Sequence, residues 1–371
     1  MNPQISEMYE DRGVLKFTLS GVHMSLANSI RRTILSDIPT VVFRTFPYNE
    51  NQATIHKNTT RFNNEILKQR LSCIPIHIQD LETPLEDFEV EINMKNKTDS
   101  IQFITSKDFR VKNIKLDSYI NTDEVRKIFP ADSITGEYID FARLRPKISD
   151  EIPGEELHIT AKLSIGTADQ DGMFNVVSTC AYANTIDPIK RDDEWKKYLT
   201  SIAKERSIDK DEQEAEKENW MLLEGKRQFK PNSFDFTVET IGVYENKVLI
   251  AKAVKIIMNS LVDIFTKISN GDFKLEESDS TLKNGYDVKL EGYDYTVGKV
   301  IEFMLYDMYY RKEETLSYIS FKKIHPHDSY GLLRFAFREP TDSGKILFLL
   351  QTAFEASRTY YEEILASFEK K

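Results

Sequence analysis

The chain has 371 residues, enough for two or three domains, and its 40% hydrophobic content is that of a folded protein with apolar cores. Its 60 acidic and 50 basic residues give a formal charge of -10, which argues against a protein that grips a nucleic-acid backbone on its own. No apolar run is long enough to span a membrane. Two cysteines, Cys73 and Cys180, are too few for a disulfide framework or a four-cysteine zinc site. We therefore expect a soluble intracellular protein without a metal or other cofactor.

A strand, a glycine and a helix are predicted near the N-terminus. Alternating apolar residues predict a half-buried strand over 15–19, and Gly21 ends it. Apolar residues at spacings of three and four then predict a helix over 24–37, which a proline ends. Further along we expect a strand at 40–46, a short helix at 59–71 and a short strand at 76–79.

The central part is predicted to be rich in β-structure. Short β-type runs separated by turn residues occur from about 81 to 177, for example at 88–94, 101–105 and 157–163. Residues 191–220 differ, because 17 of these 30 residues are charged. This composition is typical of a solvated helix or a flexible insertion. Trp195 and Trp220 suggest that the ends of the stretch are docked.

The C-terminal part returns to the opening pattern. A strand at 234–238 and a long amphipathic helix at about 246–268 come first, and a polar linker follows over 269–285. A strand at 286–290 then ends at Gly292. The remaining elements are expected to be a helix over 297–308, strands at 318–324 and 332–337, and a long helix over 342–368.

The two strand-to-helix junctions can be aligned residue by residue. Gly21 matches Gly292 after the strand. Ile30 then matches Ile301 in the helix, at the same spacing. We interpret the chain as two related α+β units, the first interrupted by a β-rich insertion. Since one unit alone would expose an apolar helix face, we expect the two units to pack on each other through their long helices, as a pseudo-symmetric dimer within one polypeptide.

Domain boundaries and core residues follow from this repeat. The expected domains are the first dimerisation unit at 1–48 and 179–268 with a charged insertion at 191–230, the β-rich insertion domain at 49–178, the linker at 269–285, and the second dimerisation unit at 286–371. The side chains expected to form the internal dimerisation seam are Leu26, Ile30, Ile34, Val297, Ile301, Met304, Phe354 and Tyr361.

Residues 25–40 (SLANSIRRTILSDIPT) resemble the hallmark helix of the α-type subunit of cellular RNA polymerases, whose pattern is SLANALRR.LL...PT. Later motifs of that family are matched in the right order at 64–76, 161–167 and 236–242. Residues 290–299 (LEGYDYTVGK) and 321–326 (FKKIHP) are similar to motifs of the small partner subunit of archaeal and eukaryotic polymerases. The chain therefore looks like a fused α-type and small partner subunit, an arrangement similar to that in some large DNA viruses.

The resemblance implies a non-catalytic assembly platform of a DNA-directed RNA polymerase. Its partners would be the two large catalytic subunits and small polymerase subunits, with no direct sequence-specific nucleic-acid contact, no membrane and no homodimer. In the family the hallmark helix touches the second-largest subunit, which implies that role for Asn28, Arg31 and Arg32. The alternative for the arginines is that they are ordinary solvated side chains. Lys299 departs from the small subunit, which has an asparagine there. A viral origin would place the protein in the host cytoplasm or the virion.

Three other groups of residues are expected to be structural. Residues 169–172 look like part of the magnesium-binding motif of the largest polymerase subunit, but Met173 replaces the third aspartate, so we expect a polar loop. His325 and His327 are too few for a metal site, and Cys73 is expected to be a packed thiol. The sequence shows no nucleophile with a recognisable partner and no phosphate-binding glycine loop. A stand-alone protein-interaction scaffold is the alternative to a polymerase subunit.

Overall fold

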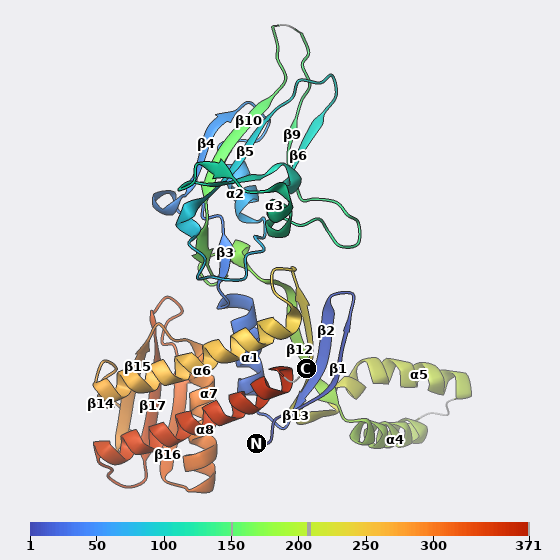
Figure 1. Ribbon diagram of the computed structural model, residues 1–371. Coiled ribbons are helices and arrows are strands. Elements are labelled where there is room, and N and C mark those ends of the chain that lie inside the picture. Colours follow the sequence, from blue (N-terminus) through green and yellow to red (C-terminus); the bar gives the residue numbers. More distant parts are fainter. Residues whose placement is uncertain (150, 206–208, 370–371) are drawn as a thin grey trace. The chain divides into compact units, whose positions relative to one another are not determined.

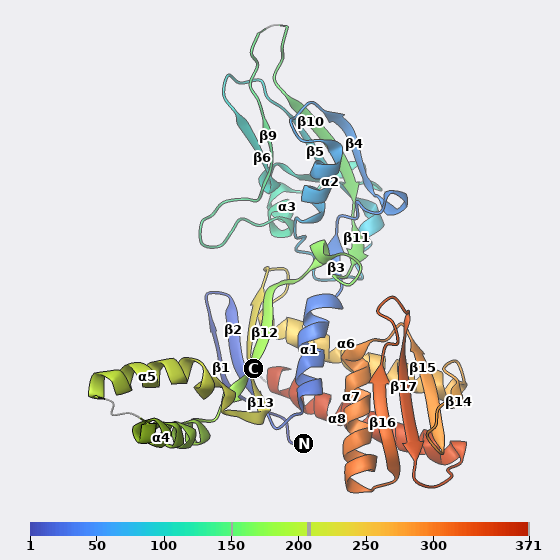
Figure 2. The ribbon, with the colours of Figure 1, turned by 180° about the vertical axis from the view of Figure 1, so that it is seen from behind.

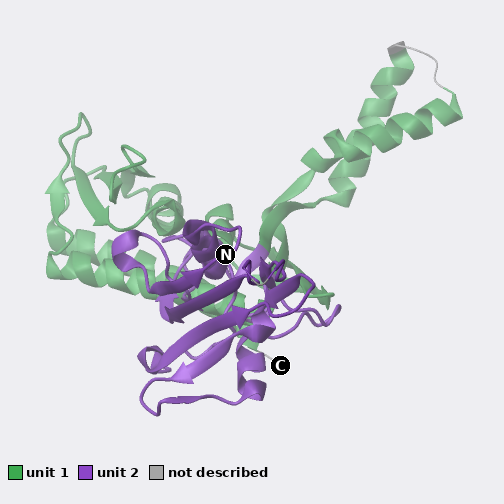
Figure 3. Ribbon diagram, turned by 90° about the horizontal axis from the view of Figure 1, so that it is seen from above, with its two compact units in different colours: residues 1–34, 179–239, 246–371 green, residues 35–178, 240–245 purple. Residues whose placement is uncertain are grey.

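The computed structural model describes residues 1–149, 151–205 and 209–369 and shows a mixed α+β protein (Figure 1). It divides into two compact units, coloured separately in Figure 3. Unit 1 comprises residues 1–34, 179–239 and 246–371, and unit 2 comprises residues 35–178 and 240–245. The N-terminal 34 residues and the C-terminal third of the chain therefore fold into the same compact unit.

Unit 1 contains two four-stranded sheets. The first has the strand order β1-β2-β13-β12, made of β1 (Gln4–Asp11), β2 (Val14–Ser20), β13 (Phe229–Thr240) and β12 (Val177–Ile186). The predicted core positions of β2 are confirmed, since Leu15, Phe17 and Leu19 are all buried, but the alternation is incomplete because Thr18 is buried as well. β2 pairs antiparallel with β13, and the rings of Phe17 and Phe236 stack at 5.0 Å.

The second sheet of unit 1 has the order β14-β15-β17-β16. Its strands are β14 (Leu275–Glu277), β15 (Gly285–Glu291), β17 (Tyr330–Phe337) and β16 (Leu316–Lys322). The helices of unit 1 outside the charged stretch are α1 (Met24–Ser36), α6 (Asn246–Asn270), α7 (Tyr295–Leu305) and α8 (Ser343–Glu369). The polar linker thus contains a short strand, and α7 ends earlier than predicted because the chain continues as a π-helical turn over Tyr306–Lys312.

Helices α6 and α8 run antiparallel and cross one face of this second sheet (Figure 1). The Phe265 and Phe354 rings meet at 5.9 Å, and Lys255 pairs with Glu369 at 3.0 Å near the other end of the contact. At the C-terminal end of α8, the ring of Phe368 lies edge-on to Phe17 of β2 at 5.1 Å. The last helix therefore joins both sheets of unit 1.

The charged stretch forms a helical hairpin of α4 (Pro188–Glu205) and α5 (Lys210–Leu222). Of the two alternatives left open for this stretch, the structure shows the helical one. Trp195 and Trp220 contact each other across the hairpin, with ring centroids 5.6 Å apart. The Tyr198 hydroxyl donates to Glu216 at 2.6 Å beside them. The aromatic side chains thus join the two helices to each other.

Unit 2 is built mainly of β-strands. Its main sheet has the order β4-β10-β5-β7-β8, made of β4 (Ala53–Asn58), β10 (Glu156–Lys162), β5 (Phe88–Lys95), β7 (Arg110–Asn113) and β8 (Ser118–Tyr119). Two further pairs are β6 (Gln102–Thr105) with β9 (Asp140–Leu144), and β3 (Thr40–Val42) with β11 (Ser164–Gly166). The helices are α2 (Asn64–Ser72) and α3 (Thr122–Ile128). Short 3-10 turns lie at Tyr48–Glu50, Leu85–Asp87, Ser106–Asp108, Gly172–Phe174 and, in unit 1, Glu224–Arg227.

Three local predictions in unit 2 need correction. The strand expected at 40–46 ends at Val42, and residues 76–79 form no strand, although Ile76 is buried. Cys73 is exposed and not a packed thiol. It follows α2 as its C-terminal cap, and the neighbouring Leu71 and Ile74 take the buried positions.

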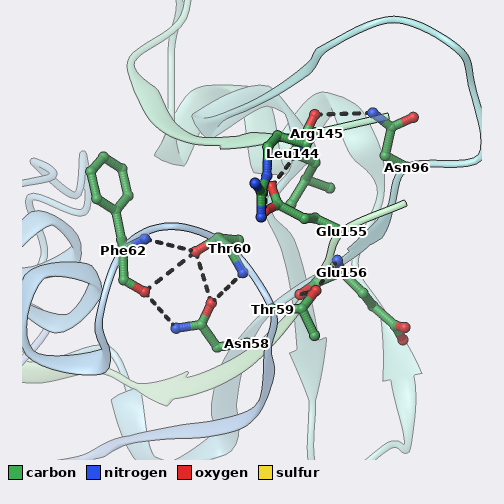
Figure 4. Close-up of polar contacts among 9 residues, drawn as sticks. All are labelled: Asn58, Thr59, Thr60, Phe62, Asn96, Leu144, Arg145, Glu155 and Glu156. Atoms are coloured by element: carbon green, nitrogen blue, oxygen red, sulfur yellow. Dashed lines mark hydrogen bonds and ion pairs between the residues drawn. The ribbon is translucent and has the colours of Figure 1, made fainter. Parts of the chain in front are cut away.

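Polar contacts shape the loops at one end of the main sheet of unit 2 (Figure 4). Asn58 accepts from the backbone N–H of Thr60 at 2.9 Å and donates to the carbonyl of Phe62 at 2.8 Å. The buried carboxylate of Glu155 accepts from the backbone N–H of Arg145 at 2.7 Å and from its guanidinium at 2.5 Å. Because this carboxylate already has its partners, the cluster holds loops in place.

Candidate subunit interface

The two strand-to-helix junctions of unit 1 each contain a glycine in the left-handed region of backbone conformation. Gly21 lies between β2 and α1 with a φ of +74°, and Gly292 lies between β15 and α7 with a φ of +77°. This left-handed region strongly favours glycine. The glycine that each copy of the sequence repeat carries is therefore required by the same turn.

Both helices that follow these turns are capped in the same way. The imidazole Nδ1 of His23 accepts from the backbone N–H of Ser25 at 3.2 Å. In the second copy the Asp294 carboxylate accepts from the backbone N–H of Thr296 at 2.8 Å. A side chain two residues before each amide thus satisfies one of the free N–H groups at the helix start.

The two helices contact each other through two reciprocal contacts (Figure 2 shows α1 beside α7). The ring of His23 lies parallel to that of Phe303, with centroids 3.7 Å apart. The guanidinium of Arg32 pairs with the carboxylate of Asp294 and donates to the Thr296 hydroxyl at 2.8 Å. In the register of the repeat, His23 is equivalent to Asp294 and Arg32 to Phe303. Each contact thus joins the helix start of one copy to a residue farther along the helix of the other.

Burial and charge set the ionisation of these groups. Burial lowers the pKa of His23, although the nearby Asp307 carboxylate opposes this effect. Burial also opposes ionisation of Asp294, but hydrogen bonds from Thr296 and the charge of Arg32 outweigh it and hold the pKa of that carboxyl below its usual value. A neutral imidazole therefore stacks on the phenyl ring, while a carboxylate faces the guanidinium.

The ion pair is only partly removed from water. The side chains of Arg32 and Asp294 are 37% and 41% exposed, so the pair contributes about 1 kcal/mol or less. Its geometry is more informative than its strength, because it shows which parts of the two helices meet.

The predicted interface residues Asn28, Arg31 and Arg32 all lie half-buried on α1. The guanidinium of Arg31 donates to the side-chain oxygen of Asn28 at 3.0 Å, one turn away on the same helix. Arg32 contacts the second half of the chain, as described above. Their role in binding a large subunit stays a prediction, and Arg32 has an internal role that the sequence did not indicate.

The eight side chains predicted for the internal seam are all at most 6% exposed, namely Leu26, Ile30, Ile34, Val297, Ile301, Met304, Phe354 and Tyr361. One polar contact lies among them. The hydroxyl groups of Ser29 on α1 and Tyr361 on α8 are 2.6 Å apart, and Ser29 donates to the carbonyl of Leu26 at 2.7 Å. The burial of these residues agrees with a core position, and their role in pairing two units stays a prediction.

A cavity of about 530 Å³ opens beside the start of α1 within unit 1. Residues that line it include Met24, Asn28, Tyr182, Lys299, Phe303 and Tyr306. Met24 and Tyr306 are exposed at 56% and 42%, which makes this an apolar, accessible place on the surface. Lys299, at the position of the family's asparagine, pairs with Glu302 at 2.6 Å.

The other polar groups considered in the sequence have structural positions. The carboxylate of Asp171 accepts from the backbone N–H of Met173 at 3.1 Å and thus caps a 3-10 turn. His325 and His327 are exposed, with rings 5.0 Å apart. Over residues 1–149, 151–205 and 209–369, no group of three or more His, Cys, Asp or Glu is arranged to hold a metal ion. Burial raises the pKa of the Cys180 thiol to about 12.

No helix in the described part of the chain is long and apolar enough to cross a membrane.

His23, Asp294 and Phe303 were missed as contact residues by sequence reasoning. The register of the repeat makes position 23 equivalent to 294 and position 32 equivalent to 303, but it does not by itself mark them as contacts. What the register does not reveal is that the contacts cross from one copy to the other.

Comparison with known proteins agrees with this architecture. The family model described as the RNA polymerase Rpb3/Rpb11 dimerisation domain matches residues 16–261. The DNA-directed RNA polymerase subunit Rpo3 of Pyrococcus furiosus is 27% identical over 277 residues, which cover 69% of this chain and 92% of that subunit. Rpo3 of Methanosphaera stadtmanae is 26% identical over 49% of this chain and 60% of its own. Human RPAC1, a subunit of RNA polymerases I and III, is 30% identical over 76 residues, 20% of each chain. The chain belongs to the Rpb3/Rpb11 dimerisation-domain family and is an α-type RNA polymerase subunit.

Proposed function

We propose that this chain is a non-catalytic assembly platform that seats the two large catalytic subunits of a multisubunit DNA-directed RNA polymerase. The observation that carries this proposal is the family match over residues 16–261, which includes the whole of the hallmark helix α1. The mechanism would be burial of protein surface and orientation of the partners, without any bond-making step in this chain.

We also propose that the chain fuses two subunits that pair with each other. The family model ends at residue 261, but β15, Gly292 and α7 repeat the arrangement of β2, Gly21 and α1. Support for pairing comes from the reciprocal contacts between α1 and α7 and from the packing of α6 on α8. Since the second half would satisfy the dimer surface of the first, we expect the isolated chain to be monomeric. A stable homodimer in light scattering after gel filtration would contradict the intramolecular pairing.

A fused chain of this kind is similar to the arrangement in some large DNA viruses of eukaryotes. We therefore propose a viral polymerase, which would act in the host cytoplasm or be packaged in the virion. Mass spectrometry of purified particles and infected cells would detect the chain in one place or the other, and its absence from both would contradict a viral origin.

For the contact with a large subunit, the best candidates are Asn28 and Arg31, together with the apolar cavity beside them. A guanidinium presents several donors in a fixed plane, which suits carboxylates or backbone carbonyls of a partner. Arg32 is less suitable as a probe of this contact, because its pairing with Asp294 makes any change there affect the fold as well.

Co-purification from the native source tests the proposal. We expect both large polymerase subunits to be recovered with the tagged chain. Arg31→Glu should reduce that recovery while circular dichroism remains unchanged. Lys196→Glu on the helical hairpin is the matched charge reversal, since this lysine is 74% exposed and makes only a surface pair, and we expect it to have no effect.

Two results would contradict these assignments. Unchanged recovery with Arg31→Glu would remove the interface role of that arginine. Recovery of the wild-type chain without any large polymerase subunit would favour the alternative, a stand-alone protein-interaction scaffold.

A further inference from the structure

We infer that the residues at positions 23 and 32 of the first half, and their equivalents 294 and 303 in the second, form a pairing code that selects unlike halves over like halves. This inference rests on the intramolecular pairing proposed above and goes beyond it, because it names the residues that decide which half pairs with which. It does not depend on the polymerase partners.

The code follows from the register of the repeat. Across the two-fold relation, the residue at the helix start of one half faces the residue farther along the helix of the other half. In the chain as it stands, one such contact is His23 on Phe303, and the other is Asp294 with Arg32. Both are chemically matched, since one is an aromatic stack and the other an ion pair with a supporting hydrogen bond.

Two first halves from different chains would be mismatched at the same places. His23 of one chain would face Arg32 of the other, twice. Both guanidiniums would lose the carboxylate of Asp294 and would face an imidazole in its place, while the hydroxyl of Ser25 would stand where that of Thr296 does now. A half-buried cation without its carboxylate partner is unfavourable.

Two second halves would be mismatched in the opposite sense. Asp294 of one chain would face Phe303 of the other, so that two carboxylates would lie against phenyl rings without a cation. Each like pairing thus carries two mismatches, whereas the unlike pairing carries none. Discrimination of this kind comes from penalties on the wrong partner as much as from contacts with the right one.

A fused chain has a reason to need such a code. The first half emerges from the ribosome well before the second, so its pairing surface is exposed to the first halves of neighbouring chains. Pairing of like halves would produce exchanged dimers and open chains of subunits. The tether favours the correct partner only after that partner has been made.

Exchanging equivalent residues between the halves tests the code in the full chain. The variant Arg32→Phe with Phe303→Arg keeps the composition but makes both unlike contacts mismatched and both like contacts matched. The variant His23→Asp with Asp294→His exchanges the other two equivalent residues and also makes the unlike contacts mismatched and the like contacts matched. Each helix start keeps a side-chain acceptor for its cap. The fourfold exchange, which combines the two, restores matched unlike contacts.

Thermal unfolding and light scattering at several concentrations are the measurements. We expect each twofold exchange to lower the unfolding midpoint by about 3 °C or more and to produce concentration-dependent dimers. We expect the fourfold exchange to recover the midpoint and the monomer. A fourfold variant no better than the twofold variants would overturn the code.

Twofold variants that unfold at a lower temperature but stay monomeric would show that the exchange does not favour pairing of like halves. This result also would overturn the code. Wild-type chain that is already a dimer would instead refute the intramolecular pairing on which the code rests. Loss of co-purification with the large subunits would bear only on the proposed function, so the three failures are distinguishable.

Discussion

The hydroxyl pair between Ser29 and Tyr361 allows a direct measurement of how α8 is bound to α1 in solution. The side chains are 1% and 0% exposed, and their oxygens are 2.6 Å apart. Because the proton of Ser29 goes to the carbonyl of Leu26, the tyrosine must be the donor in the pair. Burial raises the pKa of Tyr361, so the phenol stays protonated and able to donate.

The three variants of this pair have different expected costs. Tyr361→Phe removes a donor while Ser29 keeps its bond to the backbone, so we expect a loss of about 1 kcal/mol in the free energy of unfolding. Ser29→Ala leaves a buried phenolic hydroxyl without an acceptor, which costs about 1–3 kcal/mol. The double variant should lose less stability than the sum of the two single variants, because it leaves no hydroxyl without a partner. We expect the difference, which is the coupling free energy, to be about 1 kcal/mol.

Urea unfolding followed by far-ultraviolet circular dichroism is the suitable assay. Tryptophan fluorescence is unsuitable, since the two tryptophans of the chain both lie in the α4–α5 hairpin and report on that hairpin. Tyr9→Phe on β1 is the matched control, because that side chain is 55% exposed, and its change should stay within about 0.5 kcal/mol of zero. A coupling indistinguishable from zero would refute the contact between α8 and α1.

Three further changes have predictable outcomes. Gly21→Ala should destabilise the chain more than Gly292→Ala in urea unfolding. Both changes cost about 1–2 kcal/mol for the left-handed backbone, but at Gly21 a Cβ would also lie 1.9 Å from a backbone oxygen, whereas at Gly292 it meets nothing within 4 Å. Equal losses in the free energy of unfolding would contradict this reasoning. Burial opposes ionisation of Glu91, but the hydrogen bond from Tyr119 and further polar contacts hold the pKa of its carboxyl below the usual 4.5. The carboxylate therefore stabilises the fold fully above pH 4.5, and this stabilisation is lost as the pH falls through the pKa of the folded state. Glu91→Gln should therefore flatten the acid limb of a stability profile measured by urea unfolding at several pH values, and an unchanged acid limb would contradict it. Trp220→Ala should make the α4–α5 hairpin sensitive to limited proteolysis while the unfolding midpoint of the rest changes by less than about 2 °C, and a resistant hairpin would show that the aromatic contact is not needed.

The long periodic segments were the most predictable part of this fold. The apolar stripes predicted helices at 24–37, about 246–268 and 342–368, and the structure has α1, α6 and α8 within about two residues of these bounds. Burial of one face is what stabilises such helices, so the sequence must carry that face. In contrast, β1 was missed because only two of its eight residues are even half-buried.

Short segments were less predictable because their state depends on partners elsewhere in the chain. Residues 76–79 have apolar residues at strand spacing, and Ile76 is buried, but no neighbouring strand supplies a ladder for them. The three residues of β14 lie in a polar segment and become a strand only because β15 pairs with them. Local composition cannot settle such cases, since backbone hydrogen bonds to a distant segment decide them.

The contacts at the candidate interface show a different limit of sequence reasoning. A repeat is recognised by residues that stay alike, such as Gly21 with Gly292 and Ile30 with Ile301, and these residues preserve the turn and the core of each copy. The residues that join the copies have the opposite requirement. Under the pairing code inferred above, a two-fold contact between unlike halves is specific only if its two versions differ chemically. His23 and Asp294 fit this requirement, because both cap a helix but only one of them carries a charge. The positions where the repeat is weakest are therefore the ones most informative about how the halves meet, and they become visible only when the register is combined with the structure.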